Sequence, residues 1–380
     1  MKKKLENRKN NKSIIVSTLI FVITFIAMAG YLIYFNLTQA ESIINNSYNK
    51  RQGVLSRRTI RGSILSDDKT KLAVTNVDDD GNETRYYPYS GLFSHAIGYL
   101  NNGGYGLESL YGYYMLHSNQ NFFEQIGNDL SGNRNTGDNV VTTLNVGLQK
   151  ACYDALGSNR GAVIVMEPST GKILAMVSKP DFDPNTLAAN WSQITGEGSD
   201  SVLVNRATQG LYPPGSTFKL ITMLEYLREH KNDYGQYHYI CDGTYELGNN
   251  TINCVRTTAH GDVDLFSSLA VSCNCSFINI GLSLDLDRYK KTAEKMLFNK
   301  ELPTNLEYNK SRFVLNGESS EWDIAQTSFG QGKTVITPFH LALITCTIAN
   351  NGTLMEPYLV SSVESTNGMT VKKFKEEKYD

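Results

Sequence analysis

A serine and a lysine with helical spacing carry the clearest chemical signal in this sequence. Ser216 and Lys219 follow Pro213, Pro214 and Gly215, which end the preceding segment and place the serine near the start of a helix. At this spacing the two side chains lie on neighbouring parts of one helix face. A serine hydroxyl needs a neighbouring base to become a nucleophile, and burial can lower the pKa of a lysine far enough for that role. The pair therefore predicts nucleophilic catalysis.

The element that positions this pair is predicted to be a helix that begins at Ser216. Its apolar residues recur with a period of roughly 3.6, which predicts burial along one side; they are Phe218, Leu220, Ile221, Leu224 and Leu227. The S-x-x-K pattern alone is weak, because it recurs in less promising contexts at Ser47–Lys50, Ser66–Lys69 and Ser169–Lys172. Only the copy at Ser216 combines a Pro-Pro-Gly turn with an amphipathic helix.

The sequence gives less support to other kinds of catalytic site. A Ser/His/Asp triad that uses His260 is disfavoured, because hydrolases of that kind usually carry G-x-S-x-G and Ser216 lacks the second glycine. We therefore predict a structural role for His260. Acidic residues and histidines show no metal-ligand spacing, and no glycine-rich phosphate loop follows a strand. The sequence predicts no metal and no organic cofactor.

The six cysteines are too few for a disulfide-built scaffold in 380 residues, and their spacings do not indicate a zinc site. Cys241 and Cys254 flank a glycine-rich turn. They can form a disulfide if this part of the chain lies outside the cell, or remain a pair of buried thiols. A net charge of −2 gives no sign of a nucleic-acid partner.

The N-terminal segment has the pattern of a membrane anchor. Residues 13–35 contain no charge, and as a helix they span roughly 34 Å, enough for a hydrocarbon core of about 30 Å. We predict an uncleaved single-pass anchor rather than a signal peptide, because the apolar core is long and no clear cleavage site follows. The lysines and arginines of residues 2–12 place the N-terminus in the cytoplasm and the remaining chain outside the cell.

The rest of the chain divides by pattern. Residues 37–139 are polar, with short strand-like runs around Asp67-Asp68, and show no visible chemistry. From about residue 140 the pattern predicts a helix over Val146–Leu156 and a hairpin of Gly161–Met166 with Lys172–Val177. The predicted division is an anchor (1–36), a small β-rich domain (37–139) and a larger domain (140–380).

The segment Asn205–Lys219 (NRATQGLYPPGSTFK) resembles the active-site segment of class B penicillin-binding proteins of the penicillin-binding protein A type. These are serine D,D-transpeptidases that cross-link peptidoglycan. Ser272-Cys273-Asn274 matches the S-x-N motif of the family. Other matching segments are Arg61–Ile64, His95–Tyr99, Tyr105–Tyr111 and Ser328–Ala342.

The resemblance implies an α+β fold. After the transmembrane helix it has a non-catalytic pedestal (37–139) and a serine β-lactamase-like transpeptidase domain, with a five-stranded antiparallel sheet flanked by helices. It also implies roles for the catalytic residues Ser216, Lys219, Ser272 and Asn274. The first two act as nucleophile and base, Ser272 relays a proton, and the amide of Asn274 holds the substrate backbone. An asparagine suits that role because it both donates and accepts hydrogen bonds.

The same resemblance implies the partners. They are D-Ala-D-Ala stem peptides, β-lactams, the membrane, and a polytopic glycan polymerase of the shape, elongation, division and sporulation family. The process served would be cell-wall synthesis during elongation, division or sporulation.

The sequence departs from the family pattern in one motif. A K-T-G motif is expected beyond Asp380, and Lys333-Thr334-Val335 is a poor substitute because it lies inside the segment that matches GQG…TP. We therefore predict a chain truncated before K-T-G. Two alternatives remain: a catalytically impaired scaffold of the cell-wall machinery, and a β-lactam sensor or β-lactamase, which the pedestal disfavours.

Overall fold

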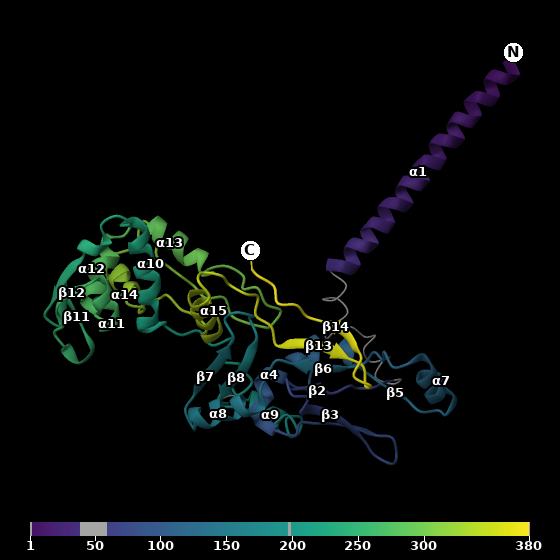
Figure 1. Ribbon diagram of the computed structural model, residues 1–380, viewed down its shortest axis with the longest axis horizontal. Coiled ribbons are helices and arrows are strands. Elements are labelled where there is room, and N and C mark those ends of the chain that lie inside the picture. Colours follow the sequence, from purple (N-terminus) through teal and green to yellow (C-terminus); the bar gives the residue numbers. More distant parts are fainter. Residues whose placement is uncertain (1, 39–58, 197–198, 380) are drawn as a thin grey trace.

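The computed structural model describes residues 2–38, 59–196 and 199–379 and mixes helices with strands, as predicted (Figure 1). The pattern Ser47–Lys50 and part of the predicted pedestal lie outside these residues. The α-helices are α1 (Lys2–Thr38), α4 (Ser94–Ile97), α5 (Leu107–Leu110), α6 (Gly112–Met115), α7 (Phe122–Leu130), α8 (Val146–Leu156), α9 (Trp191–Thr195), α10 (Lys219–Glu229), α11 (Leu265–Ala270), α12 (Asn274–Ser283), α13 (Leu286–Lys295), α14 (Glu321–Ser328) and α15 (Pro338–Ala349).

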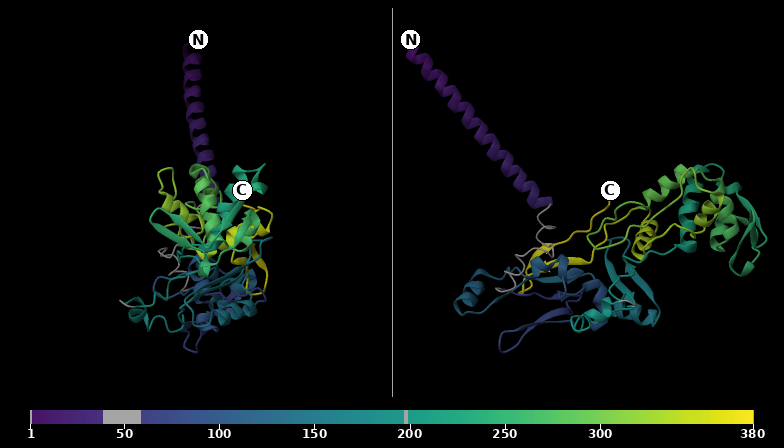
Figure 2. Two further views of the ribbon diagram at one scale, coloured as in Figure 1. Left: turned by 90° about the vertical axis from the view of Figure 1, so that its left-hand side faces the viewer. Right: turned by 180° about the vertical axis from the view of Figure 1, so that it is seen from behind.

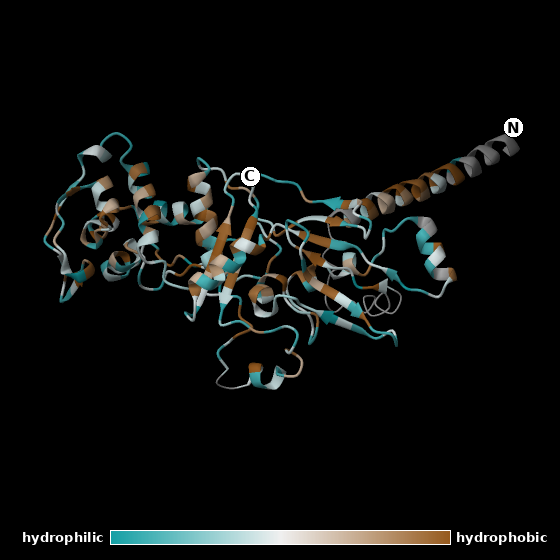
Figure 3. Ribbon diagram, turned by 60° about the horizontal axis from the view of Figure 1, so that its bottom comes forward, coloured by the Kyte–Doolittle hydropathy of each residue, from teal (hydrophilic) through white to brown (hydrophobic). Residues whose placement is uncertain are grey.

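Helix α1 extends away from the remaining structure (Figures 1 and 2). Its stretch Ile14–Phe35 has a mean hydropathy of 2.3 and none of it is buried in the protein. Figure 3 shows hydrophobic residues along most of the helix. An exposed apolar helix of this length fits a single-pass membrane anchor.

The strands form one large sheet and several pairs. They are β1 (Thr59–Ile60), β2 (Ile64–Leu65), β3 (Lys71–Val77), β4 (Glu83–Tyr86), β5 (Asn135–Thr136), β6 (Asn139–Thr142), β7 (Gly161–Met166), β8 (Ile173–Lys179), β9 (His238–Cys241), β10 (Thr244–Leu247), β11 (Asn250–Asn253), β12 (Gly261–Asp264), β13 (Val360–Glu364) and β14 (Thr370–Lys373). The large sheet has the order β14-β13-β6-β2-β3-β4, and β2 runs parallel to β6 whereas the other neighbours are antiparallel. In this sheet Val363 lies opposite Val140, so the end of the chain completes a sheet begun near its start.

A buried ion-pair network and a close backbone contact account for Arg61 and Gly62 in the segment Arg61–Ile64. The carboxylate of Glu108 accepts hydrogen bonds from Arg61 Nε at 2.9 Å and Arg85 Nε at 2.7 Å. All three side chains are almost fully buried, so each charge depends on its partners for compensation. A Cβ on Gly62 would lie 2.0 Å from the carbonyl oxygen of Asp138, which leaves room only for glycine.

The predicted hairpin and the predicted helix before it are confirmed. Strands β7 and β8 pair in register from Gly161 opposite Lys179 to Met166 opposite Ile173, and α8 covers them. The five-stranded antiparallel sheet is not observed in the described residues. There β7 and β8 form a two-stranded sheet, while β13 and β14 belong to the large sheet through β6.

The two largest apolar clusters form the main cores of an elongated molecule (Figure 1). One joins the large sheet to the hairpin and α15, and contains Ile64, Val140, Met176 and Leu343. The second lies among α10 to α14, at the opposite end from α7 (Figure 1). The first cluster continues through residue 140, so the described structure has no break in its core at the predicted domain boundary.

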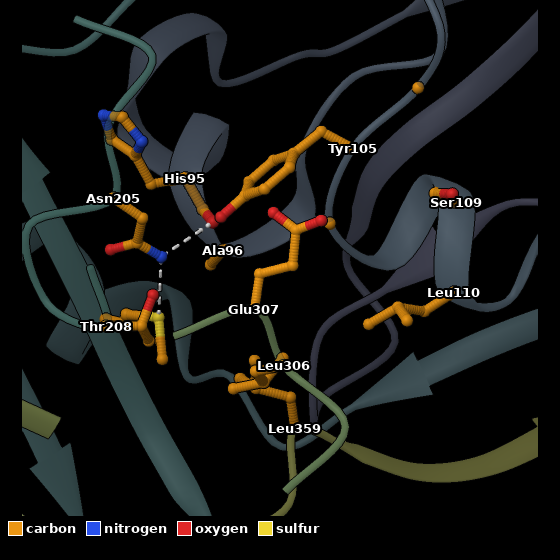
Figure 4. A pocket seen from close by; sticks show the side chains of 13 residues that line it. His95, Ala96, Tyr105, Ser109, Leu110, Asn205, Thr208, Leu306, Glu307 and Leu359 are labelled. Carbon is orange, nitrogen blue, oxygen red and sulfur yellow. Dashed lines mark hydrogen bonds between the residues drawn. The ribbon is translucent and has the colours of Figure 1, made fainter. Parts of the chain in front are cut away.

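A small cavity of about 100 Å³ lies where residues of the predicted pedestal meet the segment after β8 (Figure 4). The amide of Asn205 donates to the carbonyl of His95 at 3.3 Å and to the sulfur of Met176 at 3.4 Å. Tyr105 and Glu307 also line this cavity, whereas Ser216 and Lys219 do not. The segment that leads to Ser216 is thus bound directly to His95 in the predicted pedestal.

Candidate active site

Ser216 lies in a tight turn that is held in place by a contact between Gly215 and Gly330. It belongs to the 3-10 turn η2 (Gly215–Phe218), which runs directly into α10, and its side chain is exposed. The N–H of Gly215 donates to the carbonyl of Gly330 at 2.8 Å. Gly330 has a φ of +83°, and a Cβ there would lie 1.8 Å from Gly215 O. The GQG segment therefore fixes the turn through a contact that a larger residue would block.

Helix α10 buries a wider face than its apolar period predicted. Leu220, Leu224 and Leu227 are only half-buried, whereas Ile221 is buried as expected. Polar residues share the interior: Thr222 donates to the carbonyl of Ser328 at 2.8 Å. Because helices pack around α10 on more than one side, residues outside the predicted stripe are buried too.

The amine of Lys219 lies at the centre of the predicted catalytic residues. The residue is fully buried. Its Nζ donates to the carbonyl of Ser272 at 2.7 Å and to Asn274 Oδ1 at 2.8 Å. It lies 3.0 Å from Ser272 Oγ and 3.4 Å from Ser216 Oγ. One amine thus links all four residues that the sequence singled out.

The turn that carries Ser272 and Asn274 is built between two helices. Ser272 has a φ of +54°, a conformation that most residues avoid and that sends the chain sharply from α11 into α12. Cys273, rather than Ser272, caps α12, with its sulfur accepting from the N–H of Ser276. The amide of Asn274 also donates to the carbonyl of Asn253 at 3.0 Å, which fixes its orientation.

Burial gives Lys219 the character of a base. Removal from water lowers the pKa of its amine to about 8, while the nearby thiols of Cys273, Cys254 and Cys275 act in the opposite direction. A lysine at this pKa has a substantial neutral fraction near physiological pH and can accept a proton. The arrangement can therefore activate Ser216 for attack on a carbonyl.

The other candidate residues from the sequence do not lie beside Lys219 in the described structure. Ser66 and Lys69 lie in the turn between β2 and β3, and Ser169 lies in the hairpin turn. Lys333 is exposed and pairs with Asp323 at 3.2 Å. His260 lies against a cysteine sulfur, with its Nδ1 3.5 Å from Cys241 Sγ.

One cluster was missed from the sequence. The cluster consists of four side chains whose sulfur or nitrogen atoms lie within 4.8 Å of one another: Cys241, Cys254, His260 and Cys273. The sulfur of Cys275 lies beside that of Cys254. The structure describes all six cysteines as free, and the sulfurs of Cys241 and Cys254 lie 3.8 Å apart. The available signal was the crowding of four such residues between positions 241 and 273.

The chain matches two family models. Residues 161–379 match the penicillin binding protein transpeptidase domain. Residues 61–140 match the penicillin binding protein A dimerisation domain. The first match alone covers more than half of the chain, and it contains Lys219 and the three predicted site residues around it.

Curated relatives agree with the family models. The chain is 31% identical over 312 residues to the peptidoglycan D,D-transpeptidase PbpA of Mycolicibacterium smegmatis, which covers 76% of this chain and 61% of the relative. It is 35% identical over 262 residues to PbpA of Mycobacterium tuberculosis, covering 64% of this chain and 52% of the relative. The chain thus spans little more than half the length of these relatives.

Solved structures show the same fold. The imipenem acyl-enzyme complex of M. tuberculosis penicillin-binding protein A superposes with a TM-score of 0.75 at 28% identity, covering 84% of this chain and 78% of that one. The D,D-transpeptidase domain of a peptidoglycan glycosyltransferase from Eggerthella lenta gives 0.74 at 31% identity, with 85% and 77% covered. This chain belongs to the penicillin-binding protein transpeptidase family.

Proposed function

We propose that this chain is a penicillin-binding D,D-transpeptidase that cross-links peptidoglycan stem peptides through an acyl-serine intermediate. The observation that carries the proposal is the buried amine of Lys219, placed among Ser216 Oγ, Ser272 Oγ and Asn274 Oδ1. The relatives named as D,D-transpeptidases and the acyl-enzyme complex support it.

In the first half-reaction Ser216 Oγ attacks the carbonyl carbon of the penultimate D-Ala, while neutral Lys219 takes the hydroxyl proton. The peptide bond to the terminal D-Ala breaks, and a proton passes through Ser272 to the departing nitrogen. The result is an ester on Ser216 and free D-Ala.

In the second half-reaction an amine from a neighbouring stem peptide attacks that ester, which forms the cross-link and releases Ser216. Asn274 holds the donor backbone through its amide, whose other hydrogen bond to Asn253 already fixes it. A β-lactam would acylate Ser216 by opening its ring, and would remain as a stable ester.

The setting of this reaction follows from α1. We propose that α1 spans the membrane with the N-terminus in the cytoplasm, so that residues after the helix act on the outer side. The proposed division remains anchor (1–36), pedestal (37–139) and transpeptidase domain (140–380), although β13 and β14 extend the pedestal sheet. A glycan polymerase of the shape, elongation, division and sporulation family would contact α1 and the pedestal.

The test is the intact mass of the full chain in detergent after exposure to benzylpenicillin. We expect a covalent adduct of one penicillin per chain, absent from the Ser216→Ala variant. Ser169→Ala, in the hairpin turn, is the matched control and should retain the adduct. A folded chain that forms no adduct would support the scaffold alternative, and rapid hydrolysis of the drug would support a β-lactamase; either outcome contradicts the proposal.

A further inference from the structure

Four side chains behind the Ser272 turn have the arrangement of metal ligands. The sulfurs of Cys241 and Cys254 lie 3.8 Å apart, and so do those of Cys254 and Cys273. His260 Nδ1 lies 3.5 Å from Cys241 Sγ. All four atoms lie within 4.8 Å of one another.

The three separations of 3.8, 3.8 and 3.5 Å are close to the edge lengths of a tetrahedral zinc site. With Zn–S bonds of about 2.3 Å and Zn–N bonds of about 2.0–2.1 Å, tetrahedral geometry requires S···S edges of about 3.8 Å and S···N edges of about 3.6 Å. Disulfide pairing predicts a different pattern, in which two sulfurs approach closely and the nitrogen has no part. A single central ion accounts for the inclusion of His260.

The ligands come from the ends of separate elements. Cys241 ends β9, Cys254 follows β11, His260 precedes β12, and Cys273 caps α12. The cysteines are buried, whereas His260 is half-buried and borders solvent, which gives an ion a route inward.

A backbone group is already placed to stabilise a thiolate in the cluster. The N–H of Ser276 donates to Cys273 Sγ at the start of α12, where the helix dipole favours negative charge. Such donors to coordinating sulfurs are typical of the outer shell of metal sites.

We propose that Cys241, Cys254, His260 and Cys273 bind one zinc ion. Four protein ligands close a tetrahedral site and leave no position for water, so the ion has a structural role rather than a hydrolytic one. Cys275, 3.4 Å from Cys254, remains outside the set as a neighbouring thiol.

The ion would also act on the catalytic turn. Cys273 lies between Ser272 and Asn274, so a metal bond at this residue anchors the turn to β9, β11 and β12. This consequence rests on the proposed function, whereas the metal site itself does not. The four ligands are therefore positioning residues and not catalytic ones.

The test begins with the full chain, purified in detergent and reduced, then incubated with zinc and freed of excess metal. We expect about one zinc per chain by elemental mass spectrometry. With cobalt in place of zinc we expect the visible bands of a tetrahedral ion and a thiolate-to-metal charge-transfer band. Cys346→Ser and Cys152→Ser, whose sulfurs lie outside the cluster, should behave like the unaltered chain.

Two variants address the ligand set. His260→Ala removes the half-buried ligand at least risk to folding, and should raise the zinc dissociation constant at least about 100-fold, because even outer-shell changes cost about 10–100-fold. Cys254→Ser should abolish the charge-transfer band or reduce it strongly. Circular dichroism shows whether each variant is folded before its affinity is interpreted.

Several outcomes overturn the proposal. A folded, reduced chain without stoichiometric zinc overturns it, and so does an octahedral cobalt spectrum or an unchanged affinity in His260→Ala. If zinc binds but its removal leaves penicillin acylation unchanged, the positioning role fails while the metal site stands. If zinc binds and no adduct ever forms, the proposed function fails and the metal site again stands.

Discussion

Lys219 has more hydrogen-bond acceptors around it than a neutral amine can serve. A neutral amine donates two hydrogens, and the carbonyl of Ser272 and Oδ1 of Asn274 can only accept, so they take both. The lone pair is then left for a hydroxyl, and Ser216 Oγ at 3.4 Å is one of the two within reach. The neutral amine can thus direct its lone pair at a hydroxyl, while burial, rather than these hydrogen bonds, lowers the pKa of Lys219.

This reasoning predicts a pH dependence. Because burial lowers the pKa of Lys219 to about 8, its neutral fraction grows as the pH rises through that value. Acylation by benzylpenicillin should therefore accelerate about tenfold between pH 7 and pH 9, with an apparent pKa near 8. Stopped-flow or quenched mass measurements of the second-order rate constant would check this.

The control is Lys219→Met, which keeps a buried chain of similar length without the amine. Its acylation should be slower by about 10²–10⁴-fold, the usual contribution of a general base, and should show no step near pH 8. A wild-type profile that is flat from pH 7 to pH 9 would contradict the assignment of Lys219 as the base.

Site residues that are close in the sequence could be predicted, whereas residues that only the fold brings together could not. Ser216 and Lys219 were found because three-residue spacing in a helix is local geometry. The grouping of Cys241, Cys254 and His260 was missed because it exists only after β9, β11 and β12 fold together. The unequal spacing of these residues along the chain matches no metal-binding motif.

Among the elements, the GQG segment at residues 330–332 holds the turn at Ser216 in place. Gly330 approaches Gly215 so closely that no side chain fits between them. The bridge between Tyr212 and Ile336 holds the same two segments together a few residues away. The nucleophile is therefore positioned by an element more than one hundred residues later in the chain.

We expect Gly330→Ala to damage both stability and acylation. A methyl group would lie 1.8 Å from Gly215 O, so the turn at Ser216 must move. The expected loss is roughly 3 kcal/mol or more, since a backbone clash adds to the roughly 1–2 kcal/mol cost of a left-handed alanine. Thermal unfolding and the penicillin acylation rate measure the two effects.

Gly352→Ala is the matched control. It has the same φ of +83° but open space around the added methyl, so it reports the backbone cost alone. If the two variants unfold at the same temperature and acylate at the same rate, the contact between Gly330 and Gly215 does not position the nucleophile.

Elements defined by local pattern were predictable, and their pairing was not. The hairpin of β7 with β8 and helix α8 follow from short apolar periods and a Pro-Gly turn. The pairing of β13 with β6 depends on a register between distant segments that no local pattern records. Of the expected five-stranded sheet, the described residues form the pair β7 and β8.

Two buried histidines make the stability of the whole folded chain depend on pH. His95 packs edge-on against Phe182 at the pedestal junction, with Nε2 3.4 Å from the carbonyl of Pro180. His340 lies in α15, with Nε2 2.6 Å from the carbonyl of Met296. Burial lowers the pKa of each imidazole to about 4.

We therefore expect acid to destabilise the fold. Between pH 6.5 and pH 4 the unfolded chain binds protons at these histidines and the folded chain does not, so the free energy of unfolding falls as the pH falls. Each site contributes up to roughly 3 kcal/mol by pH 4, at about 1.4 kcal/mol per pKa unit. Melting temperatures between pH 7 and pH 4.5 would show the decline.

His95→Gln keeps a hydrogen-bond donor but cannot titrate in this range. Its melting temperature should fall less steeply with acid than that of the unaltered chain, whatever its value at pH 7. His340→Gln should reduce the slope in the same direction, because burial lowers the pKa of that imidazole as well. An unchanged slope in His95→Gln would show that other groups cause the acid sensitivity.

The pairing of β13 with β6 has a consequence for the order of events during synthesis. Val140 meets its partner Val363 only after more than two hundred further residues have been made. Until then the edge of β6 offers unpaired N–H and C=O groups, the kind of edge that recruits other chains. Nascent chains of this protein are therefore expected to need protection from aggregation until the segment around residue 360 is available, and the large sheet should be among the last parts to form.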